Sequence, residues 1–451
     1  MSKLLAALLM VVTMIAISSR AFAEEAPAEP FAFADFSWAP GNYAPPEPFF
    51  KSEHFVPELR VDSAYHYSLT QPKDDTISGS SEVFRHNELQ LTQIGFGGDA
   101  NYKNVAVRLM TQFGMYSTAT PRNDSSPSRG QWQLDDAYRY ISEAYASYHL
   151  DYMHGVNIQA GIFMSYIGLW SYYNFDNWTY QPSYVSSNTP WFFNGMRVQF
   201  FPTDKLKIEP WIINGWQSYG KFDETPGLGV QVLYKPNGDW TWVSNDYWGY
   251  DTLGAAGRQR VHSDNSTMYK YYEKPANPIS KAAASLTIDA GCEQGDGVDC
   301  GNQYFLGFMA YNRLWFHHDQ FAITVGGGAI NNPGRYLVLT PPINGATNYS
   351  GSSYFPQNTA PDGSLNRGIP FQAWDYQVTG DWMPTRNVTF RLEYTHRQAS
   401  VPYFEGASGM TPPDSNGIPV NQGSPGATVP GWTPDLVKYE DRITAAMMVR
   451  L

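Results

Sequence analysis

Apolar and polar residues alternate with a period of two along most of this chain, and this pattern limits its fold more than any other feature. In the segment 388–395, apolar side chains alternate with Thr389, Arg391, Glu393 and Thr395. Successive side chains of a β-strand point to opposite faces, so each such segment predicts a strand with one apolar and one polar face. Three further segments show the pattern clearly: 105–113, 143–150 and 374–382.

Soluble β-sandwiches also alternate, but the lengths of the segments and connections favour a transmembrane barrel. The segments are about ten residues long, which is the length a tilted strand needs to cross a bilayer. Short turns are predicted at 202–204, 236–239, 274–277 and 383–385, and long loops at 117–138, 165–191, 329–370 and 398–438. Short periplasmic turns opposite long external loops are typical of outer-membrane barrels, whereas loops of this length are unusual in compact soluble domains.

The strands can be counted from the same pattern. We predict sixteen antiparallel strands, with both ends of the barrel segment on the periplasmic side, and 14 or 18 strands as alternatives because two segments are weak and Pro210 interrupts a third. The predicted strands are 59–69, 87–97, 104–116, 139–150, 155–164, 192–202, 205–216, 227–235, 239–248, 266–273, 280–290, 302–314, 319–328, 371–382, 386–397 and 440–451. The fold class is therefore all-β, a closed transmembrane barrel over residues 58–451.

The last of these strands resembles the signal that the barrel-assembly machinery recognises. Ile443, Ala445, Met447, Val449 and Leu451 share one face of it. Such strands usually end in an aromatic residue, and Leu451 departs from that pattern.

The N-terminal residues predict export. Lys3 precedes an apolar run that ends near residue 17, and Ala21-Phe22-Ala23 follows it, which is the pattern of a signal peptide over residues 1–23. An uncleaved membrane anchor is the alternative. Residues 24–57 are rich in proline and lack periodicity, so we predict a flexible or polyproline-like periplasmic arm. The formal charge of −12, without basic clusters, argues against a nucleic-acid partner.

Two cysteines enclose a short glycine-rich loop. Because an exported protein meets an oxidising compartment, Cys292 and Cys300 are predicted to form a disulfide. The acidic residues Glu293, Asp296 and Asp299 beside them allow a calcium site as an alternative, but their spacing matches no oxygen-ligand motif.

The predicted external loop 165–191 is unusually aromatic. Its rings should be buried rather than exposed to water, so we predict that the loop folds into the lumen as a constriction; packing on the barrel rim or in an interfacial girdle is the alternative. The residues concerned are Tyr166, Trp170, Tyr172, Tyr173, Phe175, Trp178, Tyr180 and Tyr184, with Asp176 as the single charge among them. Rings in a constriction would also suit sugars, whose apolar faces stack on aromatic side chains.

These residues resemble a known family. The sequence Ala-Gly-Ile-Phe-Met-Ser-Tyr-Ile-Gly at 160–168, together with 142–146, 195–198 and 214–216, is similar to the OmpL-like β-barrel porins. The similarity is densest over 140–217. It implies a Gram-negative outer-membrane porin that passes small hydrophilic solutes and has no cofactor, with lipid and lipopolysaccharide around the barrel. Barrels of sixteen strands often resemble trimers, so we expect a homotrimer.

Inward-facing charges are candidates for lining the pore. They are Arg108, Glu143, Arg197, Lys207, Glu209, Asp375, Asp381, Arg391, Glu393, Arg442 and Arg450. Positive and negative walls orient solutes but give little net ion selectivity when their numbers nearly cancel. For the pairs Lys207–Glu209 and Arg391–Glu393, we favour structural salt bridges over a role in selecting solutes.

Motifs of enzymes are weak. The sequence lacks the metalloprotease, nucleophile-elbow and phosphate-loop motifs, and His317-His318-Asp319 falls in a predicted turn. We therefore predict a channel rather than an enzyme. The alternatives are an outer-membrane adhesin or structural barrel that binds through the loops 329–370 and 398–438, and a secreted soluble carbohydrate-active enzyme.

Overall fold

The computed structural model describes residues 28–41, 50–121, 124, 131–221, 225–251, 255–333, 370–411 and 434–451. The predicted signal peptide, 1–23, lies outside these residues. So do most of the long loops in which an adhesin would bind, because 334–369 and 412–433 are not described.

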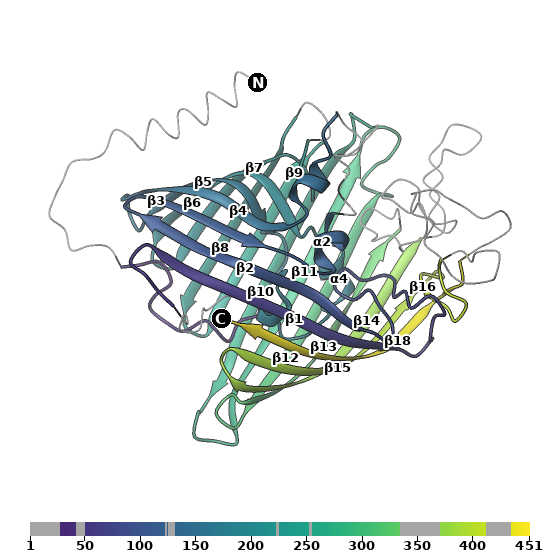
Figure 1. Cartoon of the computed structure of the whole chain (residues 1–451). Coiled ribbons are helices and arrows are strands. Elements are labelled where there is room, and N and C mark those ends of the chain that lie inside the picture. The colour runs from purple at the N-terminus through teal and green to yellow at the C-terminus, as the bar shows by residue number, and fades with distance from the viewer. Residues whose placement is uncertain are drawn as a thin grey trace.

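Sixteen strands form one closed antiparallel barrel, as predicted. Each strand pairs with its neighbours in the sequence, and β1 closes the ring by pairing with β18, so the purple and yellow strands lie side by side in Figure 1. The strands are β1 (Phe55–Ser68), β2 (Leu89–Tyr102), β3 (Val105–Thr111), β4 (Ile141–Leu150), β5 (Val156–Met164), β6 (Phe192–Thr203), β7 (Leu206–Ile213), β8 (Gly227–Asn237), β9 (Trp240–Gly249), β10 (Gln259–Glu273), β11 (Ile279–Gln294), β12 (Tyr304–Phe316), β13 (Phe321–Asn332), β14 (Phe371–Thr385), β15 (Val388–Ala399) and β18 (Tyr439–Arg450).

Short elements lie in the connections. They are α2 (Tyr116–Ala119), α3 (Leu134–Tyr138), the 3-10 turn η3 (Asn174–Asp176), α4 (Tyr184–Ser187) and the two-stranded sheet of β16 (Phe404–Glu405) with β17 (Leu436–Val437). Among the described residues, no helix has the length and apolar character needed to span a membrane.

The weak segments prove to be long strands. The predicted strands 266–273 and 280–290 belong to β10 and β11, which extend further; apolar–polar alternation does not mark their outer ends, because polar residues lie on both faces there. Pro210 lies within β7 with its ring on the exposed face, and the β6–β7 ladder lacks the pair that would include it, since proline has no amide hydrogen to donate. The barrel also begins at Phe55, three residues before the predicted boundary.

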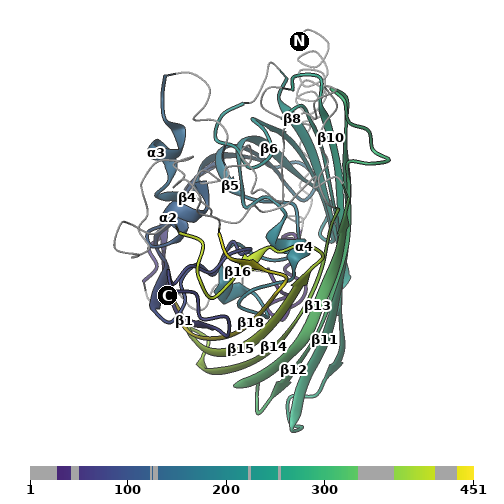
Figure 2. The ribbon, with the colours of Figure 1, turned by 90° about the vertical axis from the view of Figure 1, so that its right-hand side faces the viewer.

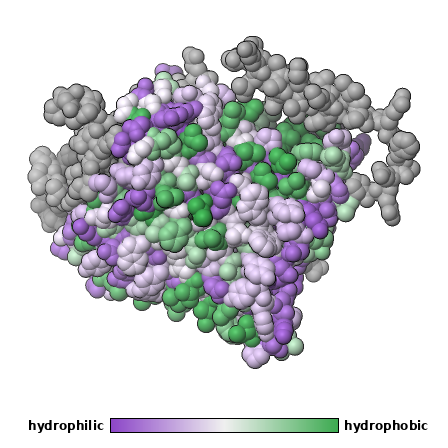
Figure 3. Space-filling view, turned by 180° about the vertical axis from the view of Figure 1, so that it is seen from behind, coloured by the Kyte–Doolittle hydropathy of each residue, from purple (hydrophilic) through white to green (hydrophobic). Residues whose placement is uncertain are grey.

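Alternation separates an apolar outer wall from a polar interior. Leu392 is 60% exposed and points outward, whereas its neighbours Arg391 and Glu393 are buried inside. Similar outward side chains include Phe308, Ile323, Trp374 and Trp382. Figure 3 shows hydrophobic side chains spread over the outer wall. This is the surface that a barrel needs in order to face lipid tails.

The two ends of the barrel differ. The short-turn end carries connections such as 204–205 and 238–239, and the long-loop end carries connections such as 165–191 and 400–438. This division matches the predicted alternation of short and long connections.

Candidate functional site

The loop 165–191, between β5 and β6, lies inside the barrel. Seven of its eight predicted aromatic residues are buried, and Phe175 is half-buried. Trp170 packs edge-on against Tyr311 of β12 at 4.8 Å between ring centroids, and Trp178 packs against Trp315 at 5.7 Å. Figure 2, which looks into the ring, shows α4 of this loop within it. The loop therefore crosses from one wall of the barrel to the other.

An acidic residue holds the turn of the loop. The Asp176 carboxylate, 1% exposed, accepts a hydrogen bond from Arg60 of β1 at 3.0 Å and another from Arg450 of β18. Arg60 also pairs with Glu58 of the same strand. Two guanidinium groups from adjacent strands thus share the loop's carboxylate in a water-poor interior, where such hydrogen bonds are strong.

Charges of β15 bind the backbone of the loop. Arg391 donates to the carbonyl oxygens of Asn177 at 2.7 Å and Asn174 at 3.2 Å. Glu393 accepts from the amides of Tyr180 and Gln181, the second at 3.0 Å. These contacts satisfy buried backbone groups that have no regular secondary structure to pair with.

The next part of the loop is held in the same way. Asp375 accepts from the Tyr184 amide at 2.8 Å and from the Ser183 hydroxyl at 2.9 Å. Arg442 of β18 contacts the Gln181 side chain and pairs with Glu440 at 2.6 Å. Six of the eleven predicted pore-lining charges (Asp375, Asp381, Arg391, Glu393, Arg442 and Arg450) therefore contact the loop or the residues that hold it.

One predicted salt bridge has a different partner. Arg391 pairs with Asp381 of β14 at 2.7 Å, and Arg313 of β12 pairs with the same carboxylate at 2.7 Å. Glu393 instead accepts hydrogen bonds from the loop amides of Tyr180 and Gln181. The prediction paired Arg391 with Glu393 because they share one face of a strand, but the cross-strand neighbour is closer to the guanidinium.

The other five predicted charges lie on the wall formed by β3, β4, β6 and β7. Arg108 forms ion pairs with Glu143 at 2.9 Å and Glu58 at 3.0 Å. Lys207 pairs with Glu209 at 2.9 Å, as predicted for that pair.

Arg197 on the same wall is 4.4 Å from the ring centroid of Phe163, an arrangement favoured by cation–π attraction. Four side chains, those of Arg108, Glu143, Arg197 and Lys207, keep between 10% and 15% of their surface accessible. They are the predicted charges that water in the lumen reaches most readily.

Several inward-facing residues of the site were not predicted. They are Glu58, Arg60, Asp62, Arg313 and Arg397, and all five are buried. The signal was present, because Glu58, Arg60 and Asp62 alternate with Leu59 and Val61, and Arg397 continues the inward series of β15.

The N-terminal arm docks into the short-turn end. Phe36, Trp38 and Ala39 are buried in the same apolar cluster as the loop 165–191. The Trp178 indole donates to the Trp38 carbonyl at 2.9 Å, and the Gly41 amide donates to the Asp176 carbonyl at 3.0 Å. The prediction of a flexible or polyproline-like arm therefore fails for residues 28–41, because two large rings find an apolar site.

Loops at the long-loop end pack on one another. Arg397 contacts the Gly79 carbonyl, and Glu405 of β16 accepts from the Ser78 amide at 3.0 Å and the Ser68 hydroxyl at 2.8 Å. Burial, together with the nearby Glu440 carboxylate, raises the pKa of Glu405 to about 8. Burial also raises the pKa of Glu82, although Arg397 opposes the shift.

The cysteine pair, the calcium alternative and the turn at 317–319 are the remaining candidate sites. A disulfide joins Cys292 and Cys300. The carboxylates of the calcium alternative are separated: Glu293 pairs with Arg260 at 3.1 Å, Asp296 accepts from the Gly257 amide and Asp299 from the Gly301 amide. In the β12–β13 turn, Asp319 pairs with Lys281 at 3.0 Å. Across the described ranges, no group of three or more His, Cys, Asp or Glu side chains is arranged to hold a metal ion.

Solved structures of outer-membrane proteins resemble this barrel. OmpT of Vibrio cholerae is 10% identical, with 90% of this chain and 100% of that chain covered and a TM-score of 0.49. An anion-selective porin from Comamonas acidovorans is 9% identical, with 88% and 99% covered and a TM-score of 0.49. DcaP of Acinetobacter baumannii is 11% identical, with 89% and 99% covered and a TM-score of 0.45. At these sequence identities and TM-scores, the solutes of those proteins cannot be assigned to this chain.

The sequence itself identifies the family. No curated protein matches it. The family model described as "Putative beta-barrel porin-2, OmpL-like" matches residues 58–419, which include the strands and the loop 165–191. Together with the closed barrel of sixteen strands, this match shows that the chain belongs to the OmpL-like family of outer-membrane β-barrel porins.

Proposed function

We propose that this porin allows small hydrophilic solutes to diffuse passively through its lumen, and that loop 165–191 is the constriction that limits their size. The observation that carries the proposal is the attachment of this loop to the opposite wall by Asp375, Arg391 and Glu393. A loop held by buried charge-assisted hydrogen bonds keeps a defined gap beside it. Selection by size needs such a fixed gap.

Pore-lining roles are proposed for the charges that keep accessible surface: Arg108, Glu143, Arg197 and Lys207. Glu209 accompanies Lys207 as its ion-pair partner. Three cations and one anion of this group lie side by side on the wall formed by β3 to β7, which would orient dipolar solutes as they pass. The other six predicted charges are proposed to position the loop.

The docked arm is proposed to narrow the exit at the short-turn end. Trp38 of the arm lies between the loop and the turn after β8. The Trp38 indole donates to the Gly238 carbonyl at 3.2 Å, and the Trp38 backbone carbonyl accepts from the Trp178 indole. The arm and the loop then form one continuous obstruction. Solutes would pass beside both.

The aromatic rings of the loop do not favour specificity for sugars. The rings of Trp170, Trp178 and Tyr180 pack against the wall, so their faces are covered. We propose a general path for small hydrophilic solutes, in which no covalent chemistry takes place.

Planar-bilayer recording tests the proposal. The purified full chain should give stepwise currents in KCl, and a variant lacking residues 170–184 should give larger steps, because the segment that crosses the lumen is gone. Heat-modifiable migration in detergent verifies that each variant is a folded barrel. A folded protein that gives no steps would refute transport and would favour a structural or adhesive barrel.

Contacts outside the lumen remain predictions. We propose that lipid and lipopolysaccharide surround the outward side chains, that the assembly machinery recognises β18, and that the barrel forms a homotrimer. Chemical cross-linking in native outer membranes should give a band at three times the monomer mass.

A further inference from the structure

The outer wall of the barrel changes character over two adjacent strands. Five outward side chains of β9 and β10 are polar, and we call them the outer polar patch. They are Ser244, Asp246, Ser263, Asn265 and Thr267, and each lies between two buried residues that point inward. On β12 and β13 the outward positions instead carry apolar side chains such as Phe308 and Ile323. Lipid tails offer no hydrogen bonds, so polar side chains on this wall require an explanation.

The patch lies within the membrane-facing band rather than at its rim. Along β9, Trp242 and Trp248 stand on either side of Ser244 and Asp246. Val230 of β8 lies directly opposite Asp246 in the register. Because aromatic residues mark the two edges of the apolar band in such barrels, a carboxylate between two tryptophans faces hydrocarbon.

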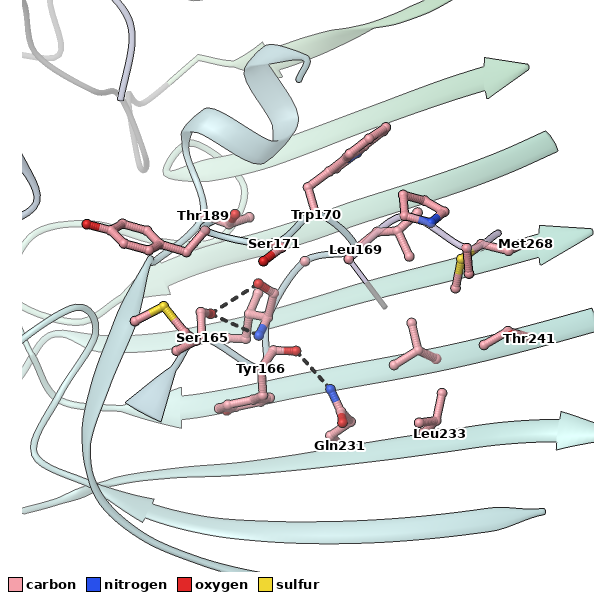
Figure 4. A pocket seen from close by; sticks show the side chains of 18 of the residues that line it. Ser165, Tyr166, Leu169, Trp170, Ser171, Thr189, Gln231, Leu233, Thr241 and Met268 are labelled. Atoms are coloured by element: carbon pink, nitrogen blue, oxygen red, sulfur yellow. Dashed lines mark hydrogen bonds between the residues drawn. The ribbon is translucent and has the colours of Figure 1, made fainter. Parts of the chain in front are cut away.

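The inner face of the same part of the wall shows the reverse pattern. Figure 4 shows Leu233 of β8 and Met268 of β10 beside a cavity of about 250 Å³, which the loop 165–191 also borders. Val243 of β9 lies on this cavity as well. Apolar residues therefore face the lumen here while polar residues face lipid, which is the opposite of the alternation in β15, where Leu392 is exposed on the outer wall.

Most of the outer polar patch is paired within the chain. The Ser244 hydroxyl donates to the side-chain carbonyl of Asn265 at 2.8 Å, and the Asn265 amide group donates to the Ser263 hydroxyl at 3.0 Å. The Thr267 hydroxyl accepts from the Trp240 indole at 2.8 Å. These bonds align the polar groups of the two strands on one surface.

The Asp246 carboxylate is the exception. It is exposed, and no described residue donates a hydrogen bond to it or forms an ion pair with it. A carboxylate that faces lipid is costly unless another molecule supplies donors. The Ser263 hydroxyl hydrogen and one hydrogen of the Asn265 amide group have no acceptor among the described residues. Two copies of the patch are therefore complementary, because each offers the donors that the other's carboxylate lacks.

We propose that the outer polar patch is the surface through which copies of this chain contact one another in the outer membrane. With the patches turned toward a common axis, the Asp246 carboxylate of each copy accepts from the Ser263 hydroxyl and the Asn265 amide group of the next. Ser244 and Ala290, which lies opposite Ser263 on β11, are small and let the two walls approach closely. Small and polar side chains are what hold protein surfaces together in lipid, where apolar contact adds little. The inference rests on the homotrimer proposed above.

Cysteine cross-linking in native outer membranes tests the location of the contact. Both native cysteines are joined in a disulfide, so the wild type should not react with a short bis-maleimide. Ser263→Cys should give a band at twice the monomer mass. Ser63→Cys is the matched control and should give no such band, because Ser63 points outward from β1, on the opposite side of the ring from β9.

Three results of this experiment would overturn the inference. They are the absence of a band from Ser263→Cys, an equal band from Ser63→Cys, and a band of another mass from Ser263→Cys. The second result would mean that barrels collide without a fixed contact, and the third that a different protein covers the patch.

The carboxylate is tested by Asp246→Leu, which makes the outer wall more apolar and should leave the barrel folded. The ratio of trimer to monomer after amine-reactive cross-linking should fall about tenfold or more, the usual effect of losing hydrogen bonds to a charged group. Asp151→Leu, at a 90% exposed position in the β4–β5 turn, is the control and should leave the ratio unchanged. A wild-type ratio in folded Asp246→Leu barrels would refute the role of this carboxylate.

The porin proposal can fail separately, because cross-linking decides the contact whether or not the barrel conducts. If the folded wild type gives no trimer band, the homotrimer and its interface are refuted together, and the KCl currents still decide conduction. If the trimer band persists but Ser263→Cys gives no cross-link, this interface alone is refuted.

Discussion

Replacing Asp176 with asparagine tests how the loop 165–191 is held. The carboxylate is buried and lies between the guanidinium groups of Arg60 and Arg450. Asparagine has the same shape but no charge, and its amide group would point a donor at one of the two guanidinium donors. Removing one partner from a buried ion pair costs about 3–5 kcal/mol. At about 1.4 kcal/mol per factor of ten, the ratio of molecules with the loop held to molecules with the loop released falls about 100- to 4,000-fold.

The expected result is a channel with larger or strongly fluctuating current steps, because the loop leaves its position for part of the time. Single-channel recording in planar bilayers measures both quantities. Asp151→Asn is the control: it removes the same charge from the β4–β5 turn, where the side chain is 90% exposed. If folded Asp176→Asn channels match the wild type in step size and noise, the loop is not held by this carboxylate and the reasoning is wrong.

Three further predictions follow from other parts of the barrel. Trp38→Ala should weaken arm docking by about 3–5 kcal/mol, since it deletes a buried ring, and should therefore raise the single-channel conductance. Phe50→Ala, at a 55% exposed position, is the control and should leave the conductance unchanged. Because the pKa of Glu405 is about 8 in the folded protein and ordinarily near 4.5, its contribution to stability is complete below pH 4.5 and is lost as the pH rises through 8. Limited proteolysis of the loop 400–411 should therefore accelerate above pH 8 in the wild type and much less in Glu405→Gln; identical pH profiles would count against this. Leu392→Arg should lower the free energy of unfolding of the barrel in lipid by about 2–4 kcal/mol because it places a charge on the lipid-facing wall, whereas Leu69→Arg in an exposed loop should change it little; urea titration in vesicles compares them.

The strands, and the face that each residue takes, follow from the sequence because both depend on a local rule. Side chains alternate along every strand, so the inward position of Arg391 and the outward position of Leu392 can be assigned without knowing the neighbouring strand. Count and order follow as well, since consecutive strands joined by short turns can only pair antiparallel. The burial of Tyr180 and its neighbours in the loop was also predictable, because aromatic rings seek an apolar site.

Partners of the charged residues could not be assigned in this way. Whether Arg391 meets Glu393 or Asp381 depends on the register between β14 and β15, and whether it then reaches the Asn177 carbonyl depends on how far the loop extends across the lumen. The docking of Trp38 beneath the loop joins residues 140 positions apart, and no local pattern encodes that distance.

The sequence by itself therefore determined the barrel, its membrane-facing wall and the residues available to its interior, because a period of two is a property of each strand alone. Only the tertiary structure decided which interior charges are used to hold the loop and which stay accessible, and that a cavity lies between the loop and strands β8 to β10. Those outcomes depend on contacts between segments far apart in the chain, where distance and burial, rather than residue type, select the partner.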